Sequence, residues 1–379
     1  MIDYEMLRII WWVLVGVLLI GFSITDGFDL GVGALLTLVG RSDNERRVMI
    51  NTIGPHWDGN QVWFITAGGA IFAAWPLIYA TAFSGFYLAL GLTLAALWMR
   101  PLGFDYRSKL PGRKWREFWD WALFAGGLVP ALIFGVAFGN LLLGVPFSMD
   151  ANLKATYSGS FFGLLRPFAL VTGLVSVAML LSHGATWLQM KTTGTLRKRA
   201  EGVAFALSLT TCMLFILAGI WVAFGVDGYT ITSVVNGAAA SNPLHKTVET
   251  VSGGWMHNYT LYPWMIAAPV LGVLASIVTA LMSKAGKAGW AFVFSSLTIA
   301  GVILTAGFSM FPFLMPSNTM LNASLTIWDA TSSHKTLDIM FWVAMIFVPI
   351  VLAYTAYCFW VMRGRLKEEH IVANSHSLY

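Results

Sequence analysis

The sequence predicts an all-α integral membrane protein, and three observations carry that prediction. Of its 379 residues, 57% are hydrophobic and 11% are charged, whereas soluble proteins average about 25% charged residues. The apolar residues gather in runs of about 20, which is the length that crosses roughly 30 Å of hydrocarbon as a helix. The basic residues are concentrated in alternate loops. We therefore expect a single polytopic domain, 1–379, with internal halves of roughly 1–160 and 161–379.

Nine apolar runs are long enough to span a membrane. They cover residues 8–38, 49–74, 79–99, 121–144, 162–187, 202–225, 261–282, 289–312 and 337–361. The second run begins with polar residues, which leaves eight spans as the alternative. Cys212 and Cys358 lie within apolar runs without the spacing of a disulfide framework or a zinc site, so we interpret them as packing residues.

The loops after alternate runs hold eighteen of the 23 Lys and Arg residues. By the positive-inside rule these loops are cytoplasmic, which places the N-terminus outside and the C-terminus in the cytoplasm. The net charge of +5 is thus explained by topology and does not indicate a nucleic acid partner. On the opposite side, three segments rich in Asn, Ser, Thr, Gly and Pro predict long external loops, at 145–161, 226–260 and 313–336.

Two acids lie in the first run, in the motif Thr25-Asp26-Gly27-Phe28-Asp29. Asp26 and Asp29 are three residues apart and therefore share one face of a helix. Carboxylates within a membrane are costly and seldom idle. They could bind a cation, pass a proton, or pair with Arg or Lys of a neighbouring helix, and the spacing leaves these alternatives open.

The stretch from His56 to Trp63 opens the second run with polar side chains. His56 and Asn60 are four residues apart and Asp58 and Gln61 three apart, so a helix here would carry two polar faces. We expect Asp58 to be buried in the cytoplasmic half of the membrane, where it would protonate reversibly; a salt bridge at the helix end is the alternative. His56 is a further candidate for proton handling or charge pairing, and Trp63 suits an interfacial anchor.

Three further positions have a plain structural reading beside a functional one. Asp105 follows the third run among basic residues, and it is either a proton collector or part of a solvated surface patch. His183 falls in an apolar run, where a haem ligand is the rarer role and a hydrogen-bonded packing residue the commoner one. The last residues, ending in Tyr379, are polar and typical of a short tail.

Five motifs, in this order along the chain, resemble subunit II of bacterial cytochrome bd ubiquinol oxidases. They are Thr25-Asp26-Gly27-Phe28-Asp29, the stretch from His56 to Trp63, the stretch from Arg100 to Arg107, Phe311-Pro312-Phe313 and the closing Leu378-Tyr379. The likeness covers essentially the whole chain. It implies two four-helix bundles plus one peripheral helix, in a multi-pass subunit of the bacterial inner membrane.

The resemblance also implies an enzyme complex, a quinol:oxygen oxidoreductase of the respiratory chain that generates a proton motive force. Haem b and haem d would be carried by a larger subunit I, so this chain alone would hold no metal and would not be catalytic. Quinol and dioxygen would be the substrates of the complex. One or more small single-helix subunits would accompany it, and a structural quinone occurs within this subunit in some members.

Matched motif by motif, the resemblance assigns roles to four residues. Asp105 and Tyr379 would lie near the cytoplasmic entrance of a proton path between the subunits, with Asp58 along its membrane portion. Trp63 would lie near a route for oxygen. Two alternatives remain, namely a purely structural assembly subunit and a secondary transporter with an ion site at Asp26 and Asp29.

Overall fold

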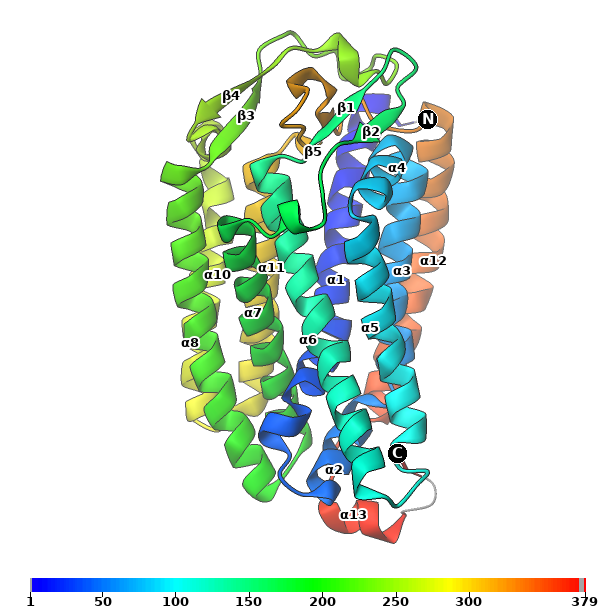
Figure 1. Cartoon of the computed structure of the whole chain (residues 1–379), viewed down its shortest axis with the longest axis vertical. Coiled ribbons are helices and arrows are strands. Elements are labelled where there is room, and N and C mark those ends of the chain that lie inside the picture. The colour runs from blue at the N-terminus through cyan, green and yellow to red at the C-terminus, as the bar shows by residue number, and fades with distance from the viewer. Residues whose placement is uncertain (1, 375–377) are drawn as a thin grey trace.

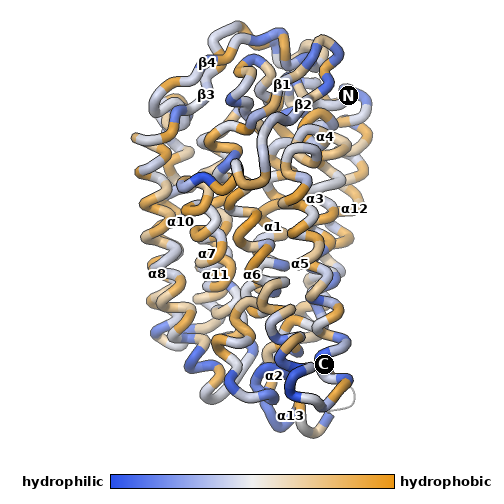
Figure 2. Tube along the Cα trace, viewed as in Figure 1, coloured by the Kyte–Doolittle hydropathy of each residue, from blue (hydrophilic) through white to orange (hydrophobic). Residues whose placement is uncertain are grey.

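The computed structural model of the chain describes residues 2–374 and 378–379 and is an elongated bundle of helices (Figure 1). Within these residues, eight helices are long and apolar enough to cross a membrane. Apolar residues line the central length of the bundle, and polar residues gather at both ends (Figure 2). The predicted fold class is therefore confirmed. The helix formed by the second predicted run is not among the eight, because its first turns are polar.

The first half of the chain forms six helices and one hairpin. These are α1 Tyr4–Val39, α2 Asp43–Ile53, α3 Trp57–Ala74, α4 Pro76–Gly85, α5 Tyr87–Tyr106, α6 Arg113–Leu143, β1 Phe147–Met149 and β2 Ala155–Tyr157. Polar side chains fix where the first two begin. The Asp3 carboxylate accepts hydrogen bonds from the backbone N–H groups of Glu5 and Met6, and Ser42 forms a capping box with Glu45.

Two predicted spans have different bounds in the structure. The run 49–74 is divided between α2 and α3, because the chain breaks at Gly54, Pro55 and His56. The run 79–99 is divided between α4 and α5, and α5 continues through Pro101 to Tyr106. Arg100, which follows the predicted run 79–99, is therefore part of a membrane helix.

The second half contributes the remaining helices and two more hairpins. Its longer elements are α7 Pro167–Lys191, α8 Gly194–Gly225, β3 Asp227–Ile231, β4 Val248–Ser252, α9 His257–Leu261, α10 Ala267–Lys284, α11 Ala288–Met310, β5 Phe313–Met315, β6 Leu325–Thr326, α12 His334–Val361 and α13 Glu368–Ala373. Short 3-10 turns connect them, at Phe162–Leu164, Pro243–His245, Gly254–Met256, Pro263–Ile266 and Leu321–Ala323.

Helix α1 lies at the centre of the bundle and packs against α3, α6 and α7. Its crossing with α7 is closed by two glycines, since a Cβ on Gly31 would lie 2.2 Å from the backbone oxygen of Leu180 and 2.9 Å from the Cα of Gly184. Small residues of this kind let membrane helices approach closely. Helix α12 is peripheral, and Leu337 is its one buried residue.

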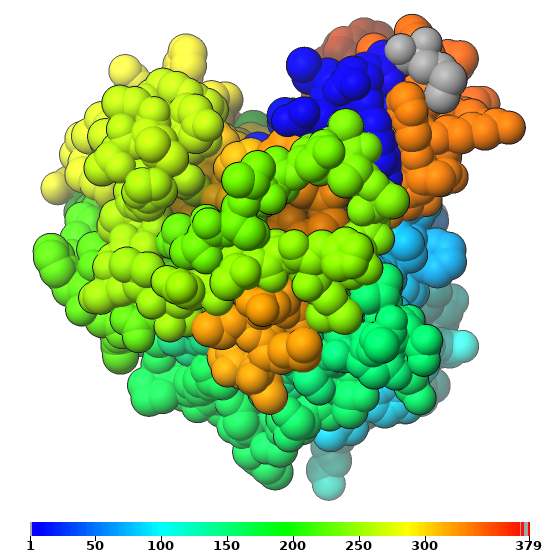
Figure 3. All heavy atoms as spheres, turned by 90° about the horizontal axis from the view of Figure 1, so that it is seen from above, coloured from blue at the N-terminus to red at the C-terminus, as the bar shows by residue number. Residues whose placement is uncertain are grey.

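The predicted external segments form a polar layer over one end of the bundle. It contains three antiparallel hairpins, β1 with β2, β3 with β4, and β5 with β6. Viewed from above, the segment after β3 reaches across the molecule to the N-terminal end of α1 (Figure 3). Arg8, which is fully buried there, donates hydrogen bonds to the backbone oxygens of Gly237 and Ala239. At the opposite end lie α2 and α13.

Candidate functional site

An ion cluster is buried between α1, α3 and α5. Two nitrogens of the Arg100 guanidinium bind the carboxylate oxygens of Asp26 at 2.9 and 2.6 Å, and one of them lies 3.8 Å from Asp29. Asn60 Nδ2 donates to the other side of Asp29 at 2.8 Å. All four side chains are buried. The structure thus brings together the two acids predicted on one face and a cation that sequence reasoning missed.

The missed cation had a signal in the sequence. A carboxylate within a membrane needs a partner, and Arg100 immediately follows an apolar run that a helix can continue. The same guanidinium occupies the place that a transported cation would take between Asp26 and Asp29. This geometry gives no support to the transporter alternative.

Asp58 is exposed at the surface of the chain, on the first turn of α3. The expectation that it is buried was wrong for the isolated subunit. Asn60, two positions later, is turned inward to Asp29, so Asp58 points about 200° away around the helix, toward the outside. The same outward face of α3 carries Val62, Ile65 and Phe72, all of which are exposed.

His56 and Trp63 belong to the inward side of the same stretch. The His56 ring is buried and stacks on Phe359 of α12, with the ring centroids 4.5 Å apart. The Trp63 ring is half-buried against Gly21 of α1 and packs in a cluster with Phe22. Neither side chain is bonded to Asp58 by any contact that the structure shows.

Tyr379 and Asp105 lie together at the end of the bundle that holds α2 and α13. The Tyr379 ring packs against Phe104, with the centroids 6.1 Å apart, and Asp105 is exposed beside it. Burial, followed by the negative charge of Asp105, raises the pKa of the Tyr379 phenol. The chain end is thus not a loose tail at this position. Arg47 and Asn51 of α2 both donate to the backbone oxygen of Tyr379, at 3.0 and 2.9 Å.

A second ionic network, which the sequence did not reveal, joins the helices of the first half at this same end of the bundle. Asp120 of α6 accepts from Arg46 at 2.7 Å and from Arg107 at 2.6 Å. Asp43 accepts from Arg107 at 2.9 Å and from Arg116 at 2.7 Å. Shared carboxylates hold α2, α5 and α6 together here, so these basic residues serve packing as well as topology.

His183 is fully buried, and both of its ring nitrogens have partners. Nδ1 lies 2.7 Å from Ser295 Oγ and Nε2 lies 2.9 Å from the backbone oxygen of Ile24. A haem ligand needs a nitrogen free to bind iron, so this geometry fits the packing role. Within residues 2–374 and 378–379, no group of three or more His, Cys, Asp or Glu side chains is arranged to hold a metal ion.

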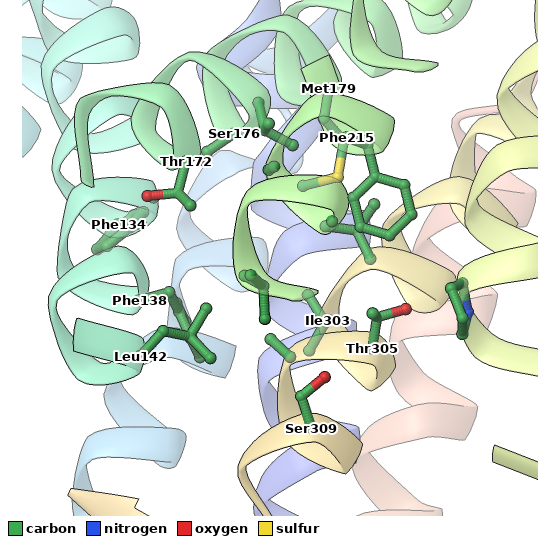
Figure 4. Close-up of a pocket in the computed structure, with 18 of the residues that line it drawn as sticks. Phe134, Phe138, Leu142, Thr172, Ser176, Met179, Phe215, Ile303, Thr305 and Ser309 are labelled. Carbon is green, nitrogen blue, oxygen red and sulfur yellow. The ribbon is translucent and has the colours of Figure 1, made fainter. Parts of the chain in front are cut away.

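A cavity of about 550 Å³ lies between the two halves of the bundle (Figure 4). Its lining comes mainly from α6, α7, α8 and α11 and is almost wholly apolar, with Phe134, Phe138, Met179, Phe215 and Ile303 among the side chains that face it. Hydroxyl-bearing side chains interrupt this surface, namely Ser23, Thr172, Ser176, Tyr259, Thr305 and Ser309. Its size falls within the range of sites for drug-sized apolar ligands.

Comparison with known proteins agrees with this picture over the full length. The chain is 59% identical to cytochrome bd-I ubiquinol oxidase subunit 2 of Escherichia coli (strain K12) over 379 residues, which is 100% of both chains. It is 31% identical to cytochrome bd ubiquinol oxidase subunit 2 of Bacillus subtilis (strain 168) over 363 residues, covering 95% of this chain and 97% of that one.

Structural comparison finds the same fold in a chain of the bd oxidase from Geobacillus thermodenitrificans. The TM-score is 0.66 at 17% identity, covering 94% of this chain and 99% of that chain. Residues 7–362 match the family described as cytochrome bd terminal oxidase subunit II. The chain therefore belongs to that family, and it is subunit II of a bd-type quinol oxidase, an oxidoreductase complex that contains haem and a subunit I.

Proposed function

We propose that this subunit carries protons from the cytoplasm toward the oxygen-reducing centre of subunit I, through Asp105, Tyr379 and Asp58. The observation that carries the proposal is the position of Asp58 on an exposed face of α3. A carboxylate that faces lipid costs about 2.5–3.5 kcal/mol even on permissive scales. We infer that subunit I covers this face, which would put Asp58 at the boundary between the two subunits.

The composition of the same face supports a covering subunit. Val62, Ile65 and Phe72 are exposed and apolar, and added side chains at Gly59 and Gly69 would meet nothing within 4 Å. Apolar residues interspersed with glycine form surfaces on which another membrane helix packs closely. An acid within such a surface is sheltered from lipid once the partner is in place.

The cytoplasmic end supports an entrance. Asp105 is exposed and can exchange protons with water, and Tyr379 is adjacent to it. A carboxylate followed by a phenol hydroxyl is a chain of groups that can pass a proton. His56, which is buried, is a further candidate along this side of α3. For Asp26 and Asp29 we propose charge pairing with Arg100 as the main role and proton handling as a lesser one.

The test is Asp58→Asn in the intact complex. The amide keeps the shape and removes the titrating proton, so we expect quinol-driven oxygen uptake to fall at least about tenfold while haem content stays intact. Glu249→Gln, an exposed acid on β4 at the opposite end, is the matched control and should change nothing. Loss of haem in Asp58→Asn would instead favour the purely structural assembly subunit, and uptake at the unmodified rate would refute the path.

For oxygen we propose access along the apolar surface that includes Trp63. Oxygen is apolar and moves between helices from the lipid, unlike a proton. The Trp63 ring lies between α3 and α1, where its packing on Gly21 leaves it half-exposed. A role as gate or guide for oxygen fits this position better than an interfacial anchor near the bundle end.

For cofactors we propose haem b and haem d on subunit I and a structural quinone in the cavity of this subunit. The two occupied nitrogens of His183 agree with haem binding elsewhere. The cavity residues fit a quinone, since Phe134, Phe138 and Phe215 offer apolar surface to an isoprenoid tail and the Ser309 hydroxyl offers a hydrogen bond to a ring oxygen. A quinone bound there would act by filling the space.

For assembly and location we propose a bacterial inner membrane subunit with its N-terminus outside and its C-terminus in the cytoplasm. The cluster of basic residues around α2 and the end of α5 supports this orientation. Quinol and dioxygen would be the substrates of the complex, and one or more small single-helix subunits would complete it. The exposed apolar surface of α12 offers such a helix a place to pack.

A further inference from the structure

We propose that α2 carries a binding site for the last two residues of the sequence, and that Arg47, Asn51 and Gly54 of this site are positioning residues for Tyr379. The three lie at spacings of four and three residues and so share one face of the helical segment. The proposal rests on the role given above to Tyr379 at the proton entrance. The present proposal names the residues that hold the Tyr379 phenol at that position.

The backbone of Tyr379 is held from both sides. Its oxygen accepts from Arg47 Nε at 3.0 Å and from Asn51 Nδ2 at 2.9 Å, and its N–H donates to Asn51 Oδ1 at 3.2 Å. Arg47 also donates to the backbone oxygen of Leu378 at 3.3 Å. Asn51 is itself fixed, because Nδ2 donates to the backbone oxygen of Arg47 at 2.8 Å. Such reciprocal bonds, two of them from the charged Arg47, select one position of the last two residues.

The ring of Tyr379 is seated on Gly54. A Cβ at position 54 would lie 2.6 Å from the ring atoms Cδ2 and Cε2, which is closer than van der Waals contact allows. Gly54 has an ordinary helical conformation, with φ −49° and ψ −39°, so the backbone does not require glycine there. Glycine at this position therefore serves to leave room for the ring.

The contacts of the ring, which we call the seat, determine where the phenol hydroxyl lies. The ring is held between Gly54 of α2 and Phe104 of α5, next to Asp105. Displacing the ring would change the distance between the hydroxyl and Asp105 without changing either side chain. Because proton transfer needs heavy atoms within hydrogen-bond reach, a displacement of about 1 Å is enough to slow it.

The experiment uses the intact complex with Gly54→Ala, which removes the room for the ring and changes no polar side chain. Hydrogen exchange measured by mass spectrometry reports on the Tyr379 amide, which the seat protects through Asn51. We expect exchange at this amide to rise at least about tenfold and quinol-driven oxygen uptake to fall at least about threefold. Gly202→Ala on α8, where an added Cβ meets nothing within 4 Å, is the matched control.

A double variant distinguishes positioning from a general loss of structure. If Gly54 acts through the Tyr379 hydroxyl, Gly54→Ala combined with Tyr379→Phe should be no slower than Tyr379→Phe alone. Additive losses would overturn the positioning role. If Gly54→Ala prevents assembly, as haem content would show, Asn51→Asp replaces it, because this isosteric change puts an acceptor opposite the Tyr379 oxygen and should give the same two effects.

The outcomes also separate this proposal from the one on which it rests. Unchanged exchange at the Tyr379 amide in both Gly54→Ala and Asn51→Asp would overturn the binding site, whatever the rate of oxygen uptake. Raised exchange with full uptake in Gly54→Ala and in Tyr379→Phe would leave the site standing, overturn its positioning role, and remove Tyr379 from the proton path.

Discussion

The two halves of the bundle are built from similar long helices but are held together by different means. In the first half, buried ion pairs join the helices, with Arg100 between α5 and α1 and Asp120 joining α6 to α2 and α5. In the second half, hydroxyls and a histidine do so. Ser182 of α7 lies 2.7 Å from Ser208 of α8, and His183 bonds Ser295 of α11.

The difference between ion pairs and hydroxyl contacts indicates which part of the subunit needs a fixed geometry. A buried ion pair contributes little net stability over an apolar pair, but it tolerates one arrangement of its partners. The half with the ion pairs carries Asp58 and Asp105 and binds Tyr379 through α2, and these are the three residues of the proposed proton path. The helices joined by hydroxyls, α7, α8 and α11, instead line a cavity of about 550 Å³ together with α6, and a cavity needs apolar surface and space.

The largest effect should come from breaking the ion cluster with Arg100→Leu. Two carboxylates, Asp26 and Asp29, would then face each other without a cation in a dry site. Removing one partner of a buried pair costs about 3–5 kcal/mol, so we expect a large loss of assembled complex, measured as haem per subunit and as the thermal midpoint.

The matched control is Arg113→Leu at the start of α6. This arginine has a similar ion pair, with Glu117 at 2.7 Å, but its side chain is 90% exposed, and exposed pairs contribute little. The midpoint should therefore not move. An Arg100→Leu complex with normal haem content and an unchanged midpoint would contradict the view that ion pairs fix the first half.

A smaller effect is expected from filling the cavity from α8, a helix of the second half. Ala218→Phe on α8 adds a ring where the cavity has room, so we expect a cost below about 1.5 kcal/mol, together with loss of quinone from the purified complex. Ala204→Phe makes the same change on the same helix, at a fully buried position in the packed core. It should cost about 1–3 kcal/mol. Thermal midpoints and quinone extraction measure both.

The pair of variants has a clear contrary outcome. Equal destabilisation by Ala218→Phe and Ala204→Phe would mean that the cavity has no more room for a ring than the packed core around Ala204. Quinone retained in full by Ala218→Phe would place that molecule elsewhere in the complex and would remove the proposed role of the cavity.

The sequence predicted the class of fold well because apolar length and charge placement are local properties. Family membership and the helical membrane fold were confirmed. The bounds of the second and third spans were wrong, because breaks at Gly54 and Phe86 lie inside runs that stay apolar. A hydropathy window stays apolar across such a break, although the helix itself ends there.

The sequence predicted which acidic residues belong to the candidate site, but it did not predict which residue pairs with them. Asp26 and Asp29 were placed on one face, yet Arg100 is 74 residues away from Asp26 in sequence, so only the fold brings them together. The inward turn of Asn60 decided that Asp58 points outward, and no spacing rule specifies which of two polar faces is inward. The roles of Asp58, Asp105, Tyr379 and Trp63 remain predictions.

The smallest effect should come from Glu45 of α2, which lies where the two halves meet and accepts from Arg199 of α8. Burial opposes its ionisation, but hydrogen bonds from Arg199 and from the backbone N–H groups of Arg41 and Ser42 outweigh this, so its pKa lies below the usual value. The folded state therefore binds the Glu45 proton less readily than the unfolded state does. Its contribution is full above the unfolded pKa of about 4.3 and is lost as the pH falls through the folded pKa.

Glu45→Gln isolates this contribution. We expect a cost of about 1 kcal/mol at pH 7, the usual size for a helix cap and a charged hydrogen bond of this kind. Thermal midpoints of both complexes between pH 7 and pH 3.5 should differ by a constant amount down to about pH 5 and then converge, because the wild-type carboxylate becomes protonated. A difference that grows as the pH falls would mean that Glu45 is more easily protonated when folded. The two halves would then be joined by the glycines of α1 and α7 and not by this acid.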